Sequence, residues 1–145
     1  MKVRIGLQLG QWPSRDIRPE AVLDLIDYFE ALDVDSIWVS DRLVSPALTL
    51  EPITFLSYIA GRLRRMKFGT STLVLPTRNP IVLAKELATL DFLSKGRLFP
   101  AIGLGGEESK DLQAVGVDST ESLVVDGREL PLADPAAQPI WKVLV

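Results

Sequence analysis

The run Lys67-Phe-Gly-Thr-Ser-Thr-Leu-Val-Leu75 is the most informative segment of the sequence. Its β-branched and apolar residues are typical of a buried strand in a parallel sheet. Asn79 and Pro80, a cap residue and a first helical residue, follow after three further residues, and Gly96 is a typical end for the helix that they begin. A second strand-like run occupies residues 98–104. The order strand, helix, strand with short connections predicts a right-handed parallel βαβ unit.

The same alternation extends toward the N-terminus. Strand-like runs also begin at residues 3 and 36, so the four runs start 33, 31 and 31 residues apart, about the length of one βα unit. Apolar residues recur at helical spacing from Val22 to Leu32 and again within residues 52–65. This pattern predicts an α/β fold with parallel strands. The order alone fits both an open doubly wound sheet and part of a (β/α)8 barrel.

The last part of the chain differs in composition from the first. Residues 1–118 hold the four βα units, with a short helix expected within residues 107–116. Residues 119–145 are rich in Pro and Asp, and Asp126-Gly127 predicts a small hairpin across residues 124–130. A final strand is expected at residues 140–145. We therefore expect an N-terminal body of four units followed by a short irregular tail.

Composition excludes several classes of function. The net charge of −3 argues against a nucleic-acid or anionic-membrane partner, because both require a basic face. No apolar run reaches the ~18 residues of a transmembrane helix, and the N-terminus lacks a signal-peptide core, so we expect a cytoplasmic protein. The absence of Cys and His excludes thiolate chemistry, a Ser-His-Asp triad and imidazole metal ligands within this chain. Any catalysis then depends on carboxylates, hydroxyls, Arg, Lys or a bound cofactor.

Charged residues at strand ends are the first candidates for a site, because parallel α/β folds bind ligands at the carboxyl ends of their strands. Asp41 ends the second strand-like run. It could accept a hydrogen bond from a ligand ring, or it could pair with Arg42 or cap the next turn. Arg78 could clamp an anion, or it could serve as a structural charge in the loop before a helix.

Small residues form a second group of candidates. Gly103, Gly105 and Gly106 follow the fourth strand, where glycines let backbone amides approach an anion or an extended cofactor chain. A tight turn between strand and helix is the alternative interpretation. Ser71 and Thr72 lie between larger apolar residues, so a flat ligand could lie against the backbone there. Tight packing is the alternative at that position.

Several separate motifs, in this order along residues 1–118, resemble the bacterial-luciferase-like flavin monooxygenases, and most of all their deazaflavin-dependent oxidoreductases. The motifs are Ile37-Trp-Val-Ser-Asp41, Gly69-Thr-Ser-Thr-Leu-Val-Leu-Pro-Thr-Arg-Asn-Pro80, Leu83-Ala-Lys-Glu-Leu-Ala-Thr-Leu-Asp91, Leu93-Ser-Lys-Gly-Arg97 and Ile102-Gly-Leu-Gly-Gly106. The resemblance implies part of a (β/α)8 TIM barrel that holds a reduced deazaflavin, coenzyme F420, or FMN. It implies hydride transfer to, or oxygenation of, a small organic substrate, with the hard chemistry supplied by the cofactor.

The resemblance also implies which residues surround the cofactor. They are Asp41 near the ring, Ser71 and Thr72 behind it, and Gly103, Gly105 and Gly106 beside its side chain. A non-prolyl cis peptide bond is expected at Ser71–Thr72. The resemblance assigns no catalytic residue and no metal ligand in this chain.

Two departures from the family pattern affect these expectations. Many members have His after the position of Asp41, where this chain has Arg42. Members that bind flavin phosphate tend to have Arg where this chain has Leu104, which favours deazaflavin over FMN.

The length of the chain bears on its activity. A full barrel needs about 250 residues, and this sequence has 145. We therefore expect the N-terminal half of a barrel, shortened internally and ended early. Open strand edges predict a homo-oligomer that does not turn over substrate by itself. The alternative is a non-catalytic half-barrel that acts only as an oligomerising or binding protein.

Overall fold

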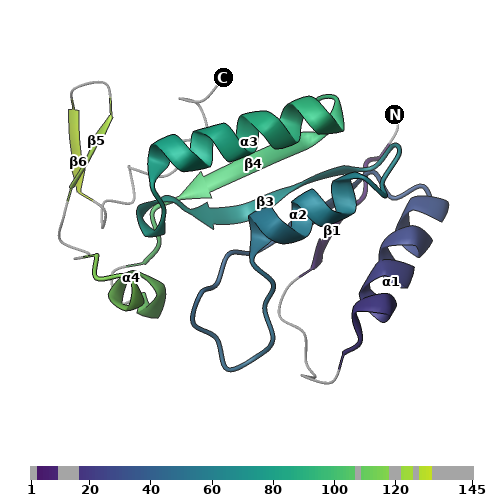
Figure 1. Cartoon of the computed structure of the whole chain (residues 1–145), viewed down its shortest axis with the longest axis horizontal. Coiled ribbons are helices and arrows are strands. Elements are labelled where there is room, and N and C mark those ends of the chain that lie inside the picture. The colour runs from purple at the N-terminus through teal and green to yellow at the C-terminus, as the bar shows by residue number, and fades with distance from the viewer. Residues whose placement is uncertain (1–2, 10–16, 107–108, 118–121, 126–127, 132–145) are drawn as a thin grey trace.

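Four parallel strands form the centre of the molecule. The computed structural model describes residues 3–9, 17–106, 109–117, 122–125 and 128–131. The strands are β1 (Gly6–Leu9), β2 (Ser36–Val39), β3 (Lys67–Val74) and β4 (Leu98–Gly103), paired in the order β1-β2-β3-β4. Neighbours in the sequence are therefore neighbours in the sheet (Figure 1). Right-handed crossovers in this sequential order place the helices on one face, which is the arrangement of part of an α/β barrel rather than of a doubly wound sheet.

Four helices follow the four strands. They are α1 (Pro19–Ala31), α2 (Pro52–Ala60), α3 (Pro80–Ser94) and α4 (Lys110–Ala114), with a 3-10 turn at Leu75–Thr77. The cap expected for α3 is confirmed, because Asn79 Oδ1 accepts the backbone amide of Ile81 at 3.0 Å. Lys95 and Gly96 end α3 in left-handed backbone conformations with φ of 58° and 75°.

Two elements differ from their expected bounds. α2 ends at Ala60, although helical spacing suggested a helix to about residue 65. Leu63 is nevertheless buried, because the turn after the helix carries it into the core. The first strand begins at Gly6 rather than at residue 3.

The tail contains the expected hairpin. Strand β5 (Ser122–Val125) pairs antiparallel with β6 (Arg128–Pro131), and Val125 lies opposite Arg128 across the position of the Asp-Gly turn. The strand expected at residues 140–145 lies outside the described residues. In the part of the chain that the structure describes, no helix is both long and apolar enough to cross a membrane.

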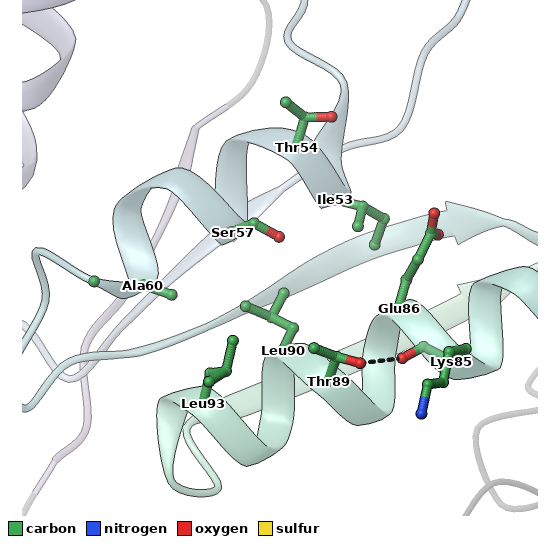
Figure 2. Close-up of a pocket in the computed structure, with 10 residues that line it drawn as sticks. Ile53, Thr54, Ser57, Ala60, Lys85, Glu86, Thr89, Leu90 and Leu93 are labelled. Carbon is green, nitrogen blue, oxygen red and sulfur yellow. Dashed lines mark hydrogen bonds between the residues drawn. The ribbon is translucent and has the colours of Figure 1, made fainter.

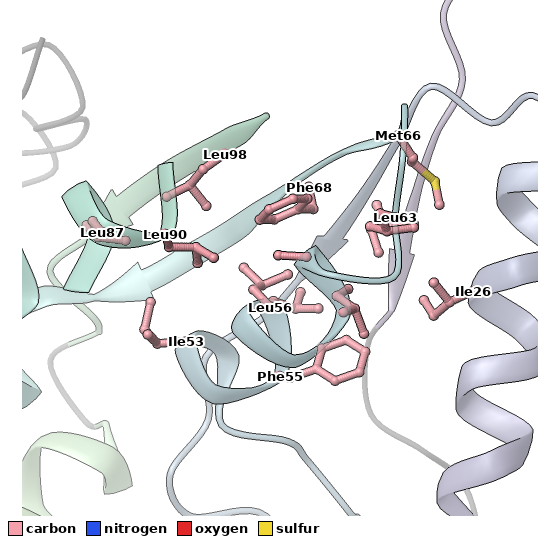
Figure 3. Packing of buried hydrophobic residues seen from close by; sticks show 14 of the residues in the cluster. Ile26, Ile53, Phe55, Leu56, Leu63, Met66, Phe68, Leu87, Leu90 and Leu98 are labelled. Carbon is pink, nitrogen blue, oxygen red and sulfur yellow. The ribbon is translucent and has the colours of Figure 1, made fainter. Parts of the chain in front are cut away.

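The core lies between the sheet and the helices (Figure 3). Ile26 of α1, Leu56 of α2 and Leu87 of α3 belong to one buried cluster with Phe68 of β3. Burial of these side chains supplies the main favourable free energy of the fold. The other face of the sheet is less covered, and Phe99 of β4 remains 42% exposed there.

Candidate functional site

A polar cleft opens where the carboxyl ends of β2, β3 and β4 meet. Its volume is about 620 Å³, and it is lined by Ser40, Asp41, Arg42, Val44, Pro46, Ser71, Thr72, Val74, Gly105, Gly106, Ser109, Lys110 and Asp111. Parallel strands bring their C-terminal loops to one edge of a sheet, so residues distant in the sequence meet there. The cleft therefore brings together Asp41, Ser71, Thr72, Gly105 and Gly106 of the residues singled out from the sequence, but not Arg78 or Gly103. Gly103 lies in β4 beside Thr72.

The middle of β3 carries the expected cis bond. The peptide between Ser71 and Thr72 is cis, which confirms the expectation from the family resemblance. Both side chains are exposed and both line the cleft. The pairing with β4 shifts register between Thr70 and Leu73, and Thr70 Oγ1 donates to the Ala101 carbonyl oxygen at 2.8 Å. The two hydroxyl side chains are thus presented to the cleft from an interrupted part of the strand.

The three glycines differ in what surrounds them and in their backbone conformation. At Gly103 a Cβ would lie 2.8 Å from Thr72 Oγ1, so a larger residue would displace that side chain. Gly105 has φ of +86°, a left-handed conformation that favours glycine. Gly106 faces open space, with no atom within 4 Å of an added Cβ. Gly105 and Gly106 therefore give the cleft a wall of bare backbone.

Asp41 pairs with Arg78. Its carboxylate oxygens accept hydrogen bonds from Arg78 Nη2 at 3.0 and 2.9 Å, and Oδ2 also accepts the Val74 amide at 3.0 Å. The Asp41 side chain is only 1% exposed. Pairing with Arg42, the alternative considered from the sequence, is wrong, because Arg42 is exposed to solvent while the carboxylate is engaged elsewhere. The Asp41 carboxylate holds the end of β3 to the end of β2.

Arg78 extends this contact to α2. Its Nη1 lies 3.0 Å from Glu51 Oε1, and the Glu51 carboxylate in turn accepts the amides of Ile53 and Thr54 at the start of the helix. Burial alone would raise the pKa of Glu51. Hydrogen bonds from Thr54 and Ile53, and the charge of Arg78, lower that pKa below its ordinary value. The Arg78 guanidinium is thus paired with the carboxylates of Asp41 and Glu51. It therefore serves as a structural charge rather than as a binding group for a free anion.

Sequence reasoning did not identify Asp111. This residue of α4 is 6% exposed, and its Oδ1 accepts the amides of Leu43 at 3.0 Å and Val44 at 2.7 Å. Its partners lie 68 and 67 positions earlier in the chain. No local pattern marks such a contact, and the only available signal was an acidic residue in the first turn of a short helix.

The chemistry of the cleft favours an organic ligand with polar edges and a negative charge. Ser71 and Thr72 offer hydroxyls, Gly106 offers uncovered backbone, and the exposed Arg42 and Lys110 carry positive charge at the rim. Among the described residues no cluster of three or more acidic side chains could hold a metal ion. Backbone and hydroxyl groups with a cationic rim fit a flavin-type cofactor, whose flat ring bears hydrogen-bonding edges and whose side chain bears phosphate.

A second hollow lies on the helical side of the sheet, away from the strand ends (Figure 2). Its volume is about 770 Å³, and it runs between α2 and α3 past Ser57, Lys85, Glu86 and Leu93. Thr89 in its wall donates a hydrogen bond to the Lys85 carbonyl oxygen at 2.7 Å, as a helical Thr commonly does. None of the residues singled out from the sequence as ligand-binding lines this hollow.

Comparison with known proteins agrees with this description. The profile of the luciferase-like monooxygenases matches residues 1–124. Limonene 1,2-monooxygenase of Rhodococcus erythropolis is 28% identical over 126 residues, which are 83% of this chain and 32% of that protein. The F420-dependent glucose-6-phosphate dehydrogenase of Amycolatopsis mediterranei is 30% identical over 116 residues, which are 74% of this chain and 31% of that protein. The chain thus spans about a third of the length of these relatives.

Solved structures show the same fold. The oxygenating constituent of 3,6-diketocamphane monooxygenase from Pseudomonas putida, in complex with FMN, superposes with a TM-score of 0.71 at 19% identity, over 82% of this chain and 34% of that one. The coenzyme F420 dependent tetrahydromethanopterin reductase of Methanopyrus kandleri gives 0.62 at 24% identity, over 79% and 30%. The family profile, which covers most of the 145 residues, places this chain in the luciferase-like monooxygenase family.

Proposed function

We propose that this chain binds a reduced deazaflavin, coenzyme F420, in the cleft at the strand ends, as part of an oxidoreductase that acts on a small organic substrate. The observation that carries the proposal is the juxtaposition of the exposed Ser71 and Thr72 with the bare backbone of Gly105 and Gly106. A flat ring can lie against the hydroxyl side chains, while an extended side chain follows the glycines. The chain spans about a third of the length of its relatives, so the activity on that substrate is proposed only for a protein that contains this cleft.

Each group has a defined role in this proposal. Bound deazaflavin supplies hydride transfer, and FMN in its place would support oxygenation. Ser71 and Thr72 orient the ring, and Gly103 leaves room for the Thr72 side chain. Asp41 borders the ring site but acts through the Val74 amide and through Arg78, because both of its oxygens are already engaged.

The preference for deazaflavin over FMN rests on position 104. FMN-binding members of the family tend to have Arg at this position, where its cation can meet the flavin phosphate. Leu104 carries no charge and is fully buried, so it cannot make that contact. Some relatives are F420-dependent by name, and one structural neighbour contains FMN. FMN is therefore the alternative ligand of the same cleft.

A titration with two matched glycine variants tests the proposal. Gly106 and Gly61 both face open space, but only Gly106 lines the cleft. Coenzyme F420 and FMN are added separately to the chain and followed by absorbance. Gly106→Leu should raise the Kd of the cofactor by at least about tenfold, because its side chain enters the cleft, whereas Gly61→Leu should leave it unchanged. The absence of any spectral change up to millimolar cofactor would overturn the proposal.

We also propose that the chain is a homo-oligomer. β1 and β4 each pair with one strand only in the described sheet, and exposed apolar side chains lie on α2 and α3. The largest are Tyr58, Ile81, Phe92 and Leu93. Such surface favours association. Light scattering that finds a stable monomer of 16.0 kDa would overturn this point. If the chain associates but binds no cofactor, the alternative of a non-catalytic oligomerising half-barrel is favoured.

A further inference from the structure

One carboxylate oxygen joins two segments that are far apart in the sequence. Asp111 Oδ1 accepts the amides of both Leu43 and Val44. These amides belong to the loop that follows β2, whereas Asp111 belongs to α4, which follows β4. A carboxylate that accepts two backbone amides makes hydrogen bonds roughly twice as strong as neutral ones.

Apolar packing contributes little to this attachment on the side of the loop. The side chains of Leu43 and Val44 are 44% and 45% exposed, so their burial holds the loop weakly. On the side of the helix, apolar burial contributes more. Leu112, the next residue after Asp111, is 2% exposed and contributes to the core beneath α4. The hydrogen bonds to Asp111 therefore fix a weakly packed loop to the buried side of α4.

The two joined segments both line the cleft. The loop after β2 contributes Arg42, Val44 and Pro46, and the segment after β4 contributes Gly105, Gly106 and Ser109. A ligand that fills the cleft contacts both segments, so the position of one segment relative to the other limits what the cleft can hold. Binding groups must be held within about 0.5 Å of their productive positions, and this contact is a direct link between the segments.

We infer that Asp111 is a positioning residue that sets the width of the cleft and, through it, the affinity for the cofactor. This inference rests on the proposed function of the cleft. Asp111 acts through its hydrogen bonds with the amides of Leu43 and Val44, which hold the loop after β2 in the position that the ligand requires. Loss of the carboxylate releases the loop and lowers the affinity for the ring and its side chain together.

Two variants of Asp111 separate this role from a general loss of structure. Asp111→Ala removes the acceptor, whereas Asp111→Asn keeps an Oδ1 that can accept both amides. Asp91→Ala, at an exposed residue of α3, makes the same change of charge away from the cleft. Amide hydrogen exchange, resolved by NMR, measures the hydrogen bonds at Leu43 and Val44 without any cofactor. Titration with coenzyme F420 and with FMN measures the affinity.

We expect Asp111→Ala to speed exchange at Leu43 and Val44 and to raise the cofactor Kd, each by at least about tenfold. In Asp111→Asn the exchange rates and the cofactor Kd should lie within about threefold of those of the unmodified chain, because the hydrogen bonds form again without the charge. Asp91→Ala should change neither. If Asp111→Ala does not fold, Leu43→Pro replaces it, since it deletes one amide donor from the side of the loop, and exchange is then measured at Val44 alone.

The outcomes that overturn the inference are distinct from failure of the proposed function. Unchanged exchange at both amides in Asp111→Ala would show that the carboxylate does not hold the loop. Faster exchange with an unchanged Kd would show that the link exists but does not position the ligand. If the unmodified chain binds neither cofactor, the proposed function fails, and exchange at Leu43 and Val44 still decides whether Asp111 joins the two segments.

Discussion

Arg97 donates a hydrogen bond from Nη2 to the carbonyl oxygen of Ala60 at 2.9 Å, and so joins the start of β4 to the end of α2. Its Nε and Nη1 donate to the carbonyl oxygens of Ser94 and Met66 at 2.9 and 3.3 Å. The guanidinium also lies over the Phe68 ring, 5.5 Å from its centre. These contacts lie at the amino ends of the strands, opposite the cleft. In a barrel, residues at that end contribute to stability rather than to chemistry.

Arg97→Lys should therefore destabilise the fold without altering the site. An ammonium cannot reproduce a planar fork that reaches three carbonyl oxygens, so we expect a loss of about 2 kcal/mol in the free energy of unfolding. Thermal unfolding followed by circular dichroism should show a Tm lower by about 4–8 °C. Arg64→Lys, at an exposed position, is the matched control and should leave the Tm unchanged. A similar loss in both variants would contradict this role of Arg97.

Glu30 should make stability depend on acid pH. Its carboxylate accepts the amides of Arg64, Arg65 and Met66, which precede β3. Burial would raise the pKa of Glu30, but hydrogen bonds from Met66, Arg65 and Arg64 and the charge of Arg65 outweigh it and lower the pKa below its ordinary value. A carboxylate with a lowered pKa stabilises the fold above its unfolded pKa, and this stability is lost as the pH falls through the folded pKa.

Urea unfolding at several pH values measures this dependence. We expect the unmodified chain to lose stability from about pH 5 downward, since an unperturbed Glu titrates near 4.3. Glu30→Gln should flatten that part of the profile and should be less stable at neutral pH by about 1–2 kcal/mol. Glu20→Gln, at an exposed residue of the first turn of α1, should keep the original pH profile. Equal slopes in the Glu30→Gln variant and the unmodified chain would contradict the assignment.

The regular elements were predictable because their signals are local. Asn79 caps α3 and Gly96 follows its end, as expected from residue types with known preferences at helix ends. The choice between a doubly wound sheet and part of a barrel was not local. It depended on which strands pair, and the order β1-β2-β3-β4 settled it. The end of α2 at Ala60 was also missed, because Leu63 keeps the helical apolar spacing from a turn outside the helix.

The site was predictable as a set of positions but not as a set of contacts. Strand ends and glycines marked the cleft, and the family resemblance marked the cis bond. The partner of Asp41 was missed, because Arg78 lies 37 positions away, whereas Arg42 is adjacent in the sequence. Asp111 was missed for the same reason. Sequence spacing within one element predicts a shared face, but it gives no information on pairs between elements.

Gly103→Ala should weaken cofactor binding through Thr72. A Cβ at position 103 would lie 2.8 Å from Thr72 Oγ1, so the Thr72 side chain would have to turn within the cleft. We expect the cofactor Kd to rise by at least about fivefold, with a loss of stability of about 1 kcal/mol. Titration of Gly103→Ala and of the double variant Gly103→Ala/Thr72→Ser measures the effect. Thr72→Ser keeps the hydroxyl but loses the methyl group, so its side chain can turn away from the new Cβ and the double variant should recover part of the affinity. An unchanged Kd in Gly103→Ala would contradict the steric explanation.

Asp41→Asn tests the ion pair with Arg78. Breaking a buried ion pair leaves an uncompensated charge, which costs about 3–5 kcal/mol in a fully buried site. The Arg78 side chain is 16% exposed and keeps its contact with Glu51, so we expect a smaller loss of about 2–3 kcal/mol. Urea unfolding measures this loss. A change within about 0.5 kcal/mol would show that the pair contributes nothing to stability.

A double-mutant cycle then separates a positioning role of Asp41 from direct contact with the ring. If Asp41 acts through Arg78, Asp41→Asn and Arg78→Met each displace the end of β3, and both raise the cofactor Kd to a similar extent. The double variant should then bind no more weakly than either single variant, because the second change removes a contact that is already lost. If Asp41 contacts the ring, Asp41→Asn alone weakens binding while Arg78→Met does not. The engaged carboxylate oxygens lead us to expect the first result.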